Sequence, residues 1–597
     1  MWRRILKAGI LFFLPFSCFG QHDITEAAIK ITGAESLETM DPYEMERLED
    51  LAAHPLRINF ASLSRLEESG LMTHYQAVSL IDYRSRHGDV LSLSELAAVD
   101  GFGSGQVALI SQFISLESHA SPFERRSDSL RLRHQLSART GLKTGQSFSY
   151  GMKYRLLAGD CFTGSLAFSR TRDSPSMKPE FYSGNMMLYS KDGDRALVVG
   201  DYNARFGQGL AFWNGMSMSG MTIPSSLMKR PAGISASSSF SGNYSLRGLA
   251  GYMSFGKMRL SPFMSFRAPE GECKVLSGIN ASFLFRKGQA SVTHYADMSF
   301  GPDERTVDDV KTSADIAWCF KGNDLFSEVA LDWKSGVMAF LAGTVFPVGE
   351  DVKTGLVMRL YPSDFSSSRS ASIRSLTKSS NEYAIGMSME YSAGRWIPLR
   401  GRSGFGSSVR RHVASMSMDY SRHPVAKGDE KNGSTQFKLK VDWTAMLTDA
   451  WKLSLRFTER VRTWGNPFRT EARADLAFDC GKLAAMLRSD LVRCESVGFL
   501  SYVEGAYVEE ASALYLRTGL FMADDWDDRI YAYERDAPGS FNVPAYYGRG
   551  FWASMMFRWK FARWGRVYVR ASMLSYAFMK EKKPGRAELK LHFEFRL

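Results

Sequence analysis

The feature that most restricts the fold of this chain is an alternation of apolar and polar residues, repeated in short segments from about residue 128 to the C-terminus. The final segment shows it most clearly, because every second position is apolar: Leu589, Leu591, Phe593, Phe595 and Leu597. Segments at residues 386–391, 437–444 and 452–457 repeat the pattern. Side chains alternate between the two faces of a strand, so each segment predicts a β-strand with one apolar face. Such strands form either a membrane barrel or one side of a soluble sandwich.

The length and continuity of this strand-rich region favour the membrane barrel. Its segments run to roughly ten residues, as transmembrane strands do, and polar turns such as residues 192–194 separate them. A soluble all-β chain of this size would normally split into domains of about 100–150 residues. We therefore predict a mainly β fold, in which a small all-α domain precedes one large antiparallel transmembrane β-barrel of about 22–26 strands at residues 128–597.

Residues 1–20 have the composition of a secretion signal peptide. A basic start at residues 3–7 precedes an apolar stretch at residues 8–16 and a small-residue cleavage site at residues 18–20. Acylation of Cys18, as in a lipoprotein, is the alternative. No run of about 18 apolar residues follows, and the mean hydropathy is −0.21. These features exclude a helical membrane protein but not a barrel.

The prediction of an exported barrel also predicts a location, the outer membrane of a diderm bacterium. Lipid would then surround the barrel. With an even number of strands both barrel ends lie on the periplasmic side, so the all-α domain should face the periplasm.

Charge is divided unevenly along the chain. Residues 22–117 hold 16 Asp and Glu against 6 Lys and Arg, a net charge of −10, whereas residues 118–597 carry +19. Such block asymmetry bears on binding partners rather than on the fold.

Helix signals dominate the region before the barrel. We predict an N-terminal helical extension at residues 21–56, two helix-turn-helix units at residues 57–117, and a linker at residues 118–127. In the extension, Asp41, Pro42 and Glu44 occupy the N-cap, N1 and N3 positions of a helix that ends at His54-Pro55. Further helices are predicted from a Ser62 cap to Ser69, from the Gly70 turn to Gly88, from a Ser94 cap to the Gly101 turn, and around Val107, Ile110 and Ile114.

Residues 57–114 resemble the tandem helix-hairpin-helix domain of the bacterial competence DNA receptor. The matching features are the Ile58-Asn59 opening, the helix end at residues 81–84, His87-Gly88, and the Gly101-Phe102-Gly103 turn. The resemblance implies that hairpin backbone amides bind a DNA phosphate, and it maps this site onto Gly70, Gly101, Gly103 and Gly105. Two departures are present: Met72 replaces the second glycine of the first hairpin, and no Lys or Arg follows either hairpin.

A glycine-rich run at residues 200–210 invites comparison with nucleotide-binding fingerprints. No helical pattern follows it, so we interpret it as a tight turn or kinked strand of the barrel wall. Asp201 and Arg205 could form an ion pair in the lumen.

The remaining reactive residues do not form a recognisable site. Five cysteines follow the signal without C-x-x-C spacing, and no histidines have metal-ligand spacing, so we predict no metal site and no cofactor. Cys480 and Cys494 could face each other on neighbouring strands and form a disulfide. Adjacent acidic pairs at residues 67–68 and 524–525 do not converge on a substrate. We therefore predict that the protein is not an enzyme.

These observations lead to two functional hypotheses. The first is a non-enzymatic outer-membrane channel or scaffold with a periplasmic helix-hairpin-helix domain that binds DNA non-specifically or binds a periplasmic protein. The alternative is a structural or envelope-assembly barrel whose helical domain docks a protein partner. A secreted nuclease would need a carboxylate or histidine cluster that the sequence does not offer. No small-molecule substrate is identifiable from the sequence.

Overall fold

We analysed a computed structural model of the chain. The structure describes residues 22–118 and 132–597, with short gaps in the second range at residues 160, 191–192, 216–220, 222, 241–244, 269–271, 302–304, 321, 394–396, 399–407, 410, 429, 431 and 580–582. The predicted signal peptide, with Cys18, and most of the predicted linker lie outside the described residues.

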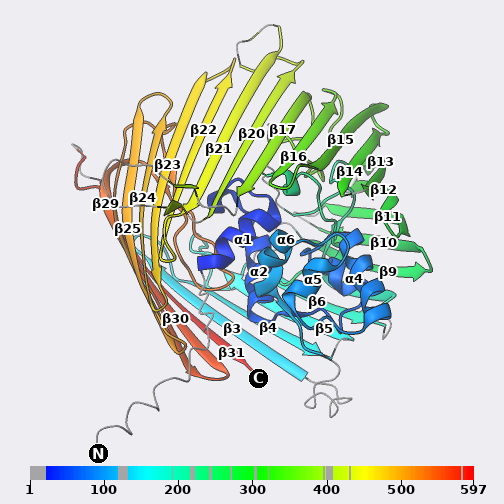
Figure 1. Cartoon of the computed structure of the whole chain (residues 1–597), viewed down its shortest axis with the longest axis horizontal. Coiled ribbons are helices and arrows are strands. Elements are labelled where there is room, and N and C mark those ends of the chain that lie inside the picture. Colours follow the sequence, from blue (N-terminus) through cyan, green and yellow to red (C-terminus); the bar gives the residue numbers. More distant parts are fainter. Residues whose placement is uncertain are drawn as a thin grey trace, which may run out of the picture.

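In the part of the chain that the structure describes, 24 antiparallel strands form a closed barrel, as predicted (Figure 1). Each strand pairs with its neighbour in the sequence, and β31 pairs with β3 to close the ring. The barrel strands are β3 (Leu132–Lys143), β4 (Ser149–Ala158), β5 (Phe162–Arg170), β6 (Phe181–Tyr189), β7 (Arg195–Arg205), β9 (Leu246–Phe255), β10 (Met258–Arg267), β11 (Cys273–Phe285), β12 (Gly288–Phe300), β13 (Arg305–Phe320), β14 (Asn323–Asp332), β15 (Val337–Val348), β16 (Val352–Tyr361), β17 (Glu382–Ala393), β20 (Arg411–His423), β21 (Ser434–Met446), β22 (Trp451–Arg462), β23 (Phe468–Cys480), β24 (Leu483–Arg493), β25 (Val497–Val508), β26 (Ser512–Ala523), β29 (Gly548–Ala562), β30 (Gly565–Ser575) and β31 (Arg586–Arg596).

The last strand confirms the predicted alternation of faces. Leu589 and Phe593 are exposed on the outside, 42% and 37% respectively, whereas Glu594 is 2% exposed and faces inward. The inward residues are nevertheless not in open water. Lys590 forms an ion pair with Asp536, which lies in the connection between β26 and β29. The inner face of the wall is therefore covered by other parts of the chain.

The two ends of the barrel differ in their connections. At the end where β3 begins and β31 ends, most connections have only a few residues, such as 256–257 and 481–482; we call this the short-turn end. The opposite, long-loop end carries the connections 206–245, 362–381 and 524–547. Short elements lie within the connections: η4 (Pro224–Ser226), β8 (Gly233–Ala236), β18 (Ile397–Pro398), β19 (Ser408–Val409), β27 (Ile530–Tyr531) and β28 (Ala545–Tyr546).

Eight short elements make up the N-terminal helical domain: α1 (His22–Thr32), η1 (Leu37–Thr39), α2 (Pro42–Ala53), α3 (Leu63–Glu68), α4 (His74–His87), α5 (Leu93–Ala98), α6 (Ser104–Ile110) and η2 (Ser111–Phe113). Asp41 caps α2 through the backbone N–H of Tyr43, and Ser62 caps α3, as predicted. The cap of α5 was predicted wrongly. Ser92, not Ser94, accepts the N–H of Glu95, because the helix begins two residues earlier than the periodicity indicated.

The helical domain has its own apolar core, which includes the fully buried residues Ala28, Leu48, Leu66, Leu80 and Phe113. Strands β1 (Leu56–Arg57) and β2 (Ile114–Ser115) pair in parallel and tie the start of the four-helix region to its end. No helix of the described residues is long and apolar enough to cross a membrane.

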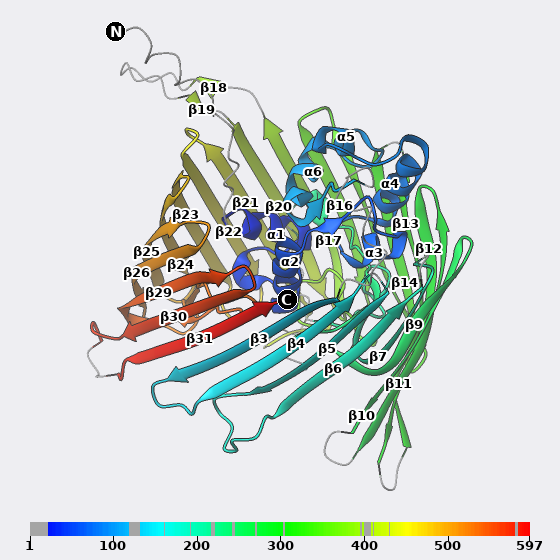
Figure 2. The ribbon, with the colours of Figure 1, turned by 90° about the horizontal axis from the view of Figure 1, so that it is seen from below.

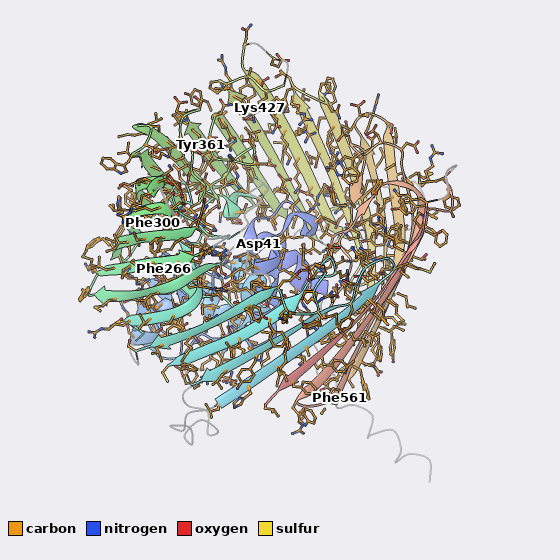
Figure 3. The ribbon with its side chains drawn as sticks, turned by 180° about the vertical axis from the view of Figure 1, so that it is seen from behind. Asp41, Phe266, Phe300, Tyr361, Lys427 and Phe561 are labelled. Carbon is orange, nitrogen blue, oxygen red and sulfur yellow. The ribbon has the colours of Figure 1, made fainter. Side chains whose placement is uncertain are left out.

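The helical domain lies largely within the ring of strands. In two perpendicular views α1 and α2 are inside the barrel (Figure 1, Figure 2). Figure 3 shows Asp41, at the start of α2, in the middle of the ring. The domain therefore occupies the lumen rather than a separate position beside the barrel.

Candidate functional site: the interface between the helical domain and the lumen

The first part of the interface joins α1 and η1 to a basic patch on β21–β24. Glu26 contacts Lys452, and Glu35 contacts Lys438. Lys440 donates to the backbone oxygen of Glu35 at 2.7 Å. These cations project into the lumen because they occupy alternate positions of their strands. The patch holds the first helical turns against one side of the wall.

Glu38 is the most enclosed of these acidic side chains. Its side chain is 5% exposed and lies 3.2 Å from both Arg473 on β23 and Arg488 on β24. Each arginine also has a carboxylate partner on the wall, Asp490 for Arg473 and Asp475 for Arg488. The alternating charges make a continuous network from the helical domain into the barrel wall.

Helix α2 extends the interface to the opposite side of the barrel. Glu46 contacts Lys153 and Asp50 lies 2.5 Å from Arg155, both on β4. Glu44 contacts Arg205, at the inward end of β7.

Helices α3 and α4 meet the wall at the short-turn end. Glu67 lies 2.6 Å from Arg259 at the start of β10, and Asp82 lies 3.4 Å from Arg286 in the β11–β12 turn. Ser64 donates to the backbone oxygen of Gly193, in the β6–β7 turn, at 2.8 Å. We call the eight acidic residues that form ion pairs with wall cations the docking carboxylates: Glu26, Glu35, Glu38, Glu44, Glu46, Asp50, Glu67 and Asp82.

The pKa values of the acidic residues separate positions where ion pairs outweigh burial from positions where burial outweighs the partners. Burial alone would raise the pKa of Glu67, but Arg259 and His74 lower it to about 2. Arg47 and Arg205 likewise outweigh burial and lower the pKa of Glu44 to about 2. Ion pairs outweigh burial in the same way at Glu38 and Asp50, whose pKa values lie well below the ordinary carboxyl value.

Three other buried carboxyls of the domain behave in the opposite way. Burial raises the pKa of Glu49 to about 8, and the N–H of Gly539 offsets only part of this effect. Burial also raises the pKa of Glu68 to about 7 and, together with the charge of Glu44, that of Asp41 to about 7. The interface thus contains carboxyls that favour docking when ionised and others that favour it when protonated.

The described residues of the connection 206–245 include several that pack inward and narrow the lumen further. Phe206 and Phe212 pack against Phe263 and Tyr295 of the wall, with ring centroids 4.8 Å apart for Phe212 and Phe263. The glycine-rich run at residues 200–210 forms the inward end of β7 and the turn after it. The predicted strand of the wall and a tight turn are therefore both present, and the turn half of the run lies in the lumen.

The glycine-rich turn already holds a carboxyl group, and this group belongs to the protein itself. Glu328 of β14 accepts the backbone N–H groups of Gln208, Leu210 and Ala211 at 2.7, 3.0 and 3.1 Å. Positive φ angles at Gly207 (57°) and Gly209 (76°) make this arrangement accessible.

The ion pair predicted between Asp201 and Arg205 is wrong. Asp201 pairs with Arg247 at 2.9 Å, whereas Arg205 pairs with Glu44 of the helical domain. Residues four apart on an extended strand are too distant for a close pair unless the strand bends between them.

The four predicted phosphate-binding glycines lie in two different environments. Gly70 is buried, and a Cβ there would lie 2.0 Å from a guanidinium nitrogen of Arg47, which also donates to the backbone oxygen of Ser69. Gly101, Gly103 and Gly105 are exposed, and a Cβ at Gly103 or Gly105 would meet no atom within 4 Å. The structure thus does not bring the two hairpins to one open site, and phosphate binding by these glycines stays a prediction.

The disulfide considered between Cys480 and Cys494 is not formed. All five cysteines of the described residues are free. Cys480 pairs with Leu483 at one end of the β23–β24 hairpin, whereas Cys494 follows Arg493 at the other end. At about 3.3 Å per residue the strand length far exceeds the roughly 7 Å Cα separation that a disulfide allows. The described residues also contain no group of three or more His, Cys, Asp or Glu that could hold a metal ion.

Sequence reasoning missed the wall residues that contact the docking carboxylates. Their signal was present in the opposite net charges of the two regions, −10 and +19. The alternation also placed residues such as Lys438 and Lys440 on the inner face. What the sequence could not show is that the partner of the basic lumen is the acidic domain of the same chain.

No family model and no curated protein sequence matches this chain. Among solved structures, the siderophore receptor PirA from Pseudomonas aeruginosa is similar with a TM-score of 0.39 and 7% identity over 79% of this chain and 81% of that chain. The P pilus usher (PapC) translocation pore gives 0.30 and 9% over 78% and 99%, and OccK2 from Pseudomonas aeruginosa gives 0.27 and 9% over 79% and 99%. With TM-scores this low, the class rests on the strand pairings: a closed antiparallel β-barrel with an N-terminal helical domain in its lumen.

Proposed function

We propose that the protein is a non-enzymatic outer-membrane channel whose acidic helical domain closes the lumen. The observation that carries this proposal is the ring of docking carboxylates, which contact cations on β4, β7, β10 and β21–β24 and in the β11–β12 turn. Contacts on several sides of the lumen hold the domain as a plug. A solute can pass only when the domain moves or rearranges.

The orientation follows from the connections. Transmembrane barrels have short periplasmic turns and longer extracellular loops. The short-turn end, where α3 and α4 meet the wall, would thus face the periplasm. The long-loop end would face the outside, where the connection 206–245 narrows the mouth.

The electrostatic contacts supply a direct test in planar lipid bilayers. We expect the combined variant Glu35→Gln, Glu38→Gln, Glu46→Gln and Asp50→Asn to conduct more often and at higher conductance than the wild type. Each substitution keeps the side-chain shape but removes the charge that the wall cations attract. The matched control is Glu509→Gln, in an exposed pair with Lys482 at the short-turn end. Equal conductance of the combined variant and the wild type would contradict the proposal.

Exposed apolar residues near the start of α5 favour a second role for the helical domain, the binding of a protein partner. Leu91 and Leu93, at the start of α5, are 66% and 42% exposed. Exposed apolar side chains beside acidic residues such as Glu95 suit a periplasmic protein better than DNA. Site-specific photo-crosslinking from position 93 in cells tests this role: a defined adduct lost in Leu91→Ser supports it, and no adduct contradicts it.

A further inference from the structure

A cavity of about 430 Å³ lies on the lumenal side of the wall, lined by residues of β3–β5, β29–β31 and the connection 524–547. Its lining includes residues of the β3–β4, β5–β6 and β26–β29 connections, so it lies toward the long-loop end. Six cationic side chains line it, against two carboxylates, Asp173 and Asp536: Arg139, Lys143, Arg170, Arg172, Lys590 and Arg570.

Three of these cations form no ion pair with a described residue. Arg139 lies over the ring of Phe240, 3.9 Å from its centroid, and its hydrogen-bond acceptor is the backbone oxygen of Gly539 at 3.4 Å. Arg170 donates to backbone oxygens, including that of Ser174 at 2.8 Å. Lys143 is half-buried at the end of β3. Carbonyl groups orient a guanidinium but do not neutralise its charge.

The other three cations share carboxylates that are already engaged. Glu588 contacts both Arg172 and Arg570, the latter at 2.8 Å. Arg570 also contacts Glu534, and Lys590 contacts Asp536. The six cations therefore outnumber the four carboxylates in or beside the lining, Asp173, Glu534, Asp536 and Glu588. The cavity retains a positive excess, which is costly in a partly desolvated place unless an anion enters.

Gly141 keeps the floor of the cavity open. A Cβ at this position would lie 3.0 Å from both the Arg172 guanidinium and the Ser149 hydroxyl. Neutral hydrogen-bonding groups lie between the cations, among them Ser149, Tyr150 and Gln146. Cations interspersed with hydroxyl and amide groups complement an anion that itself carries hydroxyl groups.

We propose that this cavity binds a small polyhydroxylated anion, a sugar phosphate or sugar acid, and that such anions are the solutes of the channel. The volume lies within the roughly 300–1,000 Å³ range of small-molecule sites. A site at the outer mouth would concentrate the solute before the helical domain moves. The assignment of solute class rests on the proposed channel function, whereas binding itself does not.

Isothermal titration calorimetry of the full-length, detergent-purified protein tests the site. The probes are glucose 6-phosphate and gluconate, with glucose as the uncharged control. We expect one or both anions to bind, glucose not to bind, and the affinity to fall as salt increases. Which anion binds more tightly distinguishes a phosphate from a carboxylate site. Failure of the folded wild type to bind either anion would overturn the proposal.

Substitutions locate the binding. Lys143→Gln alone should weaken anion binding. The double variant Arg139→Gln with Lys143→Gln should weaken it at least tenfold. Lys482→Gln, a paired lysine at the opposite end of the barrel, should leave it unchanged. Because Lys143 is only half-buried, its variant should fold even where the double variant fails. Equal affinity in Lys143→Gln and the wild type would place the anion elsewhere and overturn the assignment.

Different outcomes would reject the channel proposal and the anion-site proposal. Anion binding without any conductance, even after the docking carboxylates are neutralised, would retain the site and reject the channel. Conductance in the neutralised variant without anion binding would retain the channel and reject the site.

Discussion

Leu487 and Arg488 are neighbours on β24, yet they lie in opposite surroundings. Leu487 is 44% exposed on the outer face, as a lipid-facing residue would be. Arg488 points into the lumen, where Glu38 of the helical domain and Asp475 of the wall contact it. The outer face therefore has the apolar side chains that suit contact with lipid, whereas the inner face has charged side chains that contact specific residues of the helical domain. The channel proposal depends on this difference.

Removal of the inner cation should have the largest effect. Arg488→Leu should lower the free energy of unfolding by about 3–5 kcal/mol, because it leaves Asp475 and Glu38 buried with fewer partners. Chemical denaturation in detergent micelles measures this. Adding Glu38→Gln should recover part of the loss, as expected for residues that interact. A loss below about 1 kcal/mol, typical of a solvent-exposed pair, would mean that the lumen at this position is open to water.

A charge on the outer face should have a slightly smaller effect. Leu487→Arg should cost about 2–4 kcal/mol if the position lies near the middle of a bilayer. The shape-conserving control Leu487→Met should cost less than about 1.5 kcal/mol. Folding measurements in lipid vesicles provide both values. Tolerance of arginine at Leu487 would contradict a lipid-facing outer surface.

The inner face should also respond to pH in two directions. Ionised Glu38, Glu44, Asp50 and Glu67 have lowered pKa values when docked, so the docking that they provide is lost as pH falls from about 4.5 toward 2. Glu49, with a raised pKa of about 8, instead weakens docking as pH rises from about 4.5 toward 8. Protease accessibility of the helical domain should therefore increase at both extremes.

One variant distinguishes the increase in protease accessibility at high pH from the increase at low pH. Glu49→Gln should remove the part of the loosening at high pH that Glu49 causes, because the amide does not ionise; the part due to Asp41 and Glu68 should stay. The loosening at low pH should also stay. Accessibility that is flat across this range, or unchanged by the variant at pH 8, would show that these carboxyls do not control docking.

The smallest expected effect concerns the two glycine hairpins, which share a sequence pattern but not an environment. The first is buried against Arg47, and the second is exposed. We expect the full-length protein to bind duplex DNA weakly, with a Kd in or above the roughly 10⁻⁴–10⁻⁶ M range of non-specific complexes. Gly103→Val should abolish even this binding without unfolding the domain, since its side chain meets open space. Sub-micromolar binding that Gly103→Val removes would make DNA handling a main function.

The sequence predicts what depends on local pattern. Alternation identified the outer and inner faces of β31, and the N-cap residues Asp41 and Ser62 located two helix starts. Strand number was also predictable within a narrow range, because each hairpin carries its own turn signal. These features follow from neighbouring residues alone.

Contacts between distant segments were not predictable. The ion pair of Glu38 with Arg473 spans more than 400 positions, and nothing local selects that arginine over the others on the wall. Arg205 was assigned to Asp201, four positions earlier on the same strand, yet its partner is Glu44 of the helical domain. Lys590 and Glu594 lie on the inner face, as the alternation predicts, but nothing in the local pattern shows that the connection 524–547 and the wall enclose them.

The central claim is that the docked helical domain closes the channel. Carbodiimide couples carboxylates to amines in direct contact, and the pairs Glu35–Lys438 and Glu46–Lys153 are suitable targets. The decisive measurement is the bilayer conductance of the wild type before and after coupling, with the coupled peptides identified by mass spectrometry. We predict that coupling abolishes the openings seen beforehand. Unchanged conductance with both pairs coupled would show that the channel conducts while the domain is docked, and would contradict the claim.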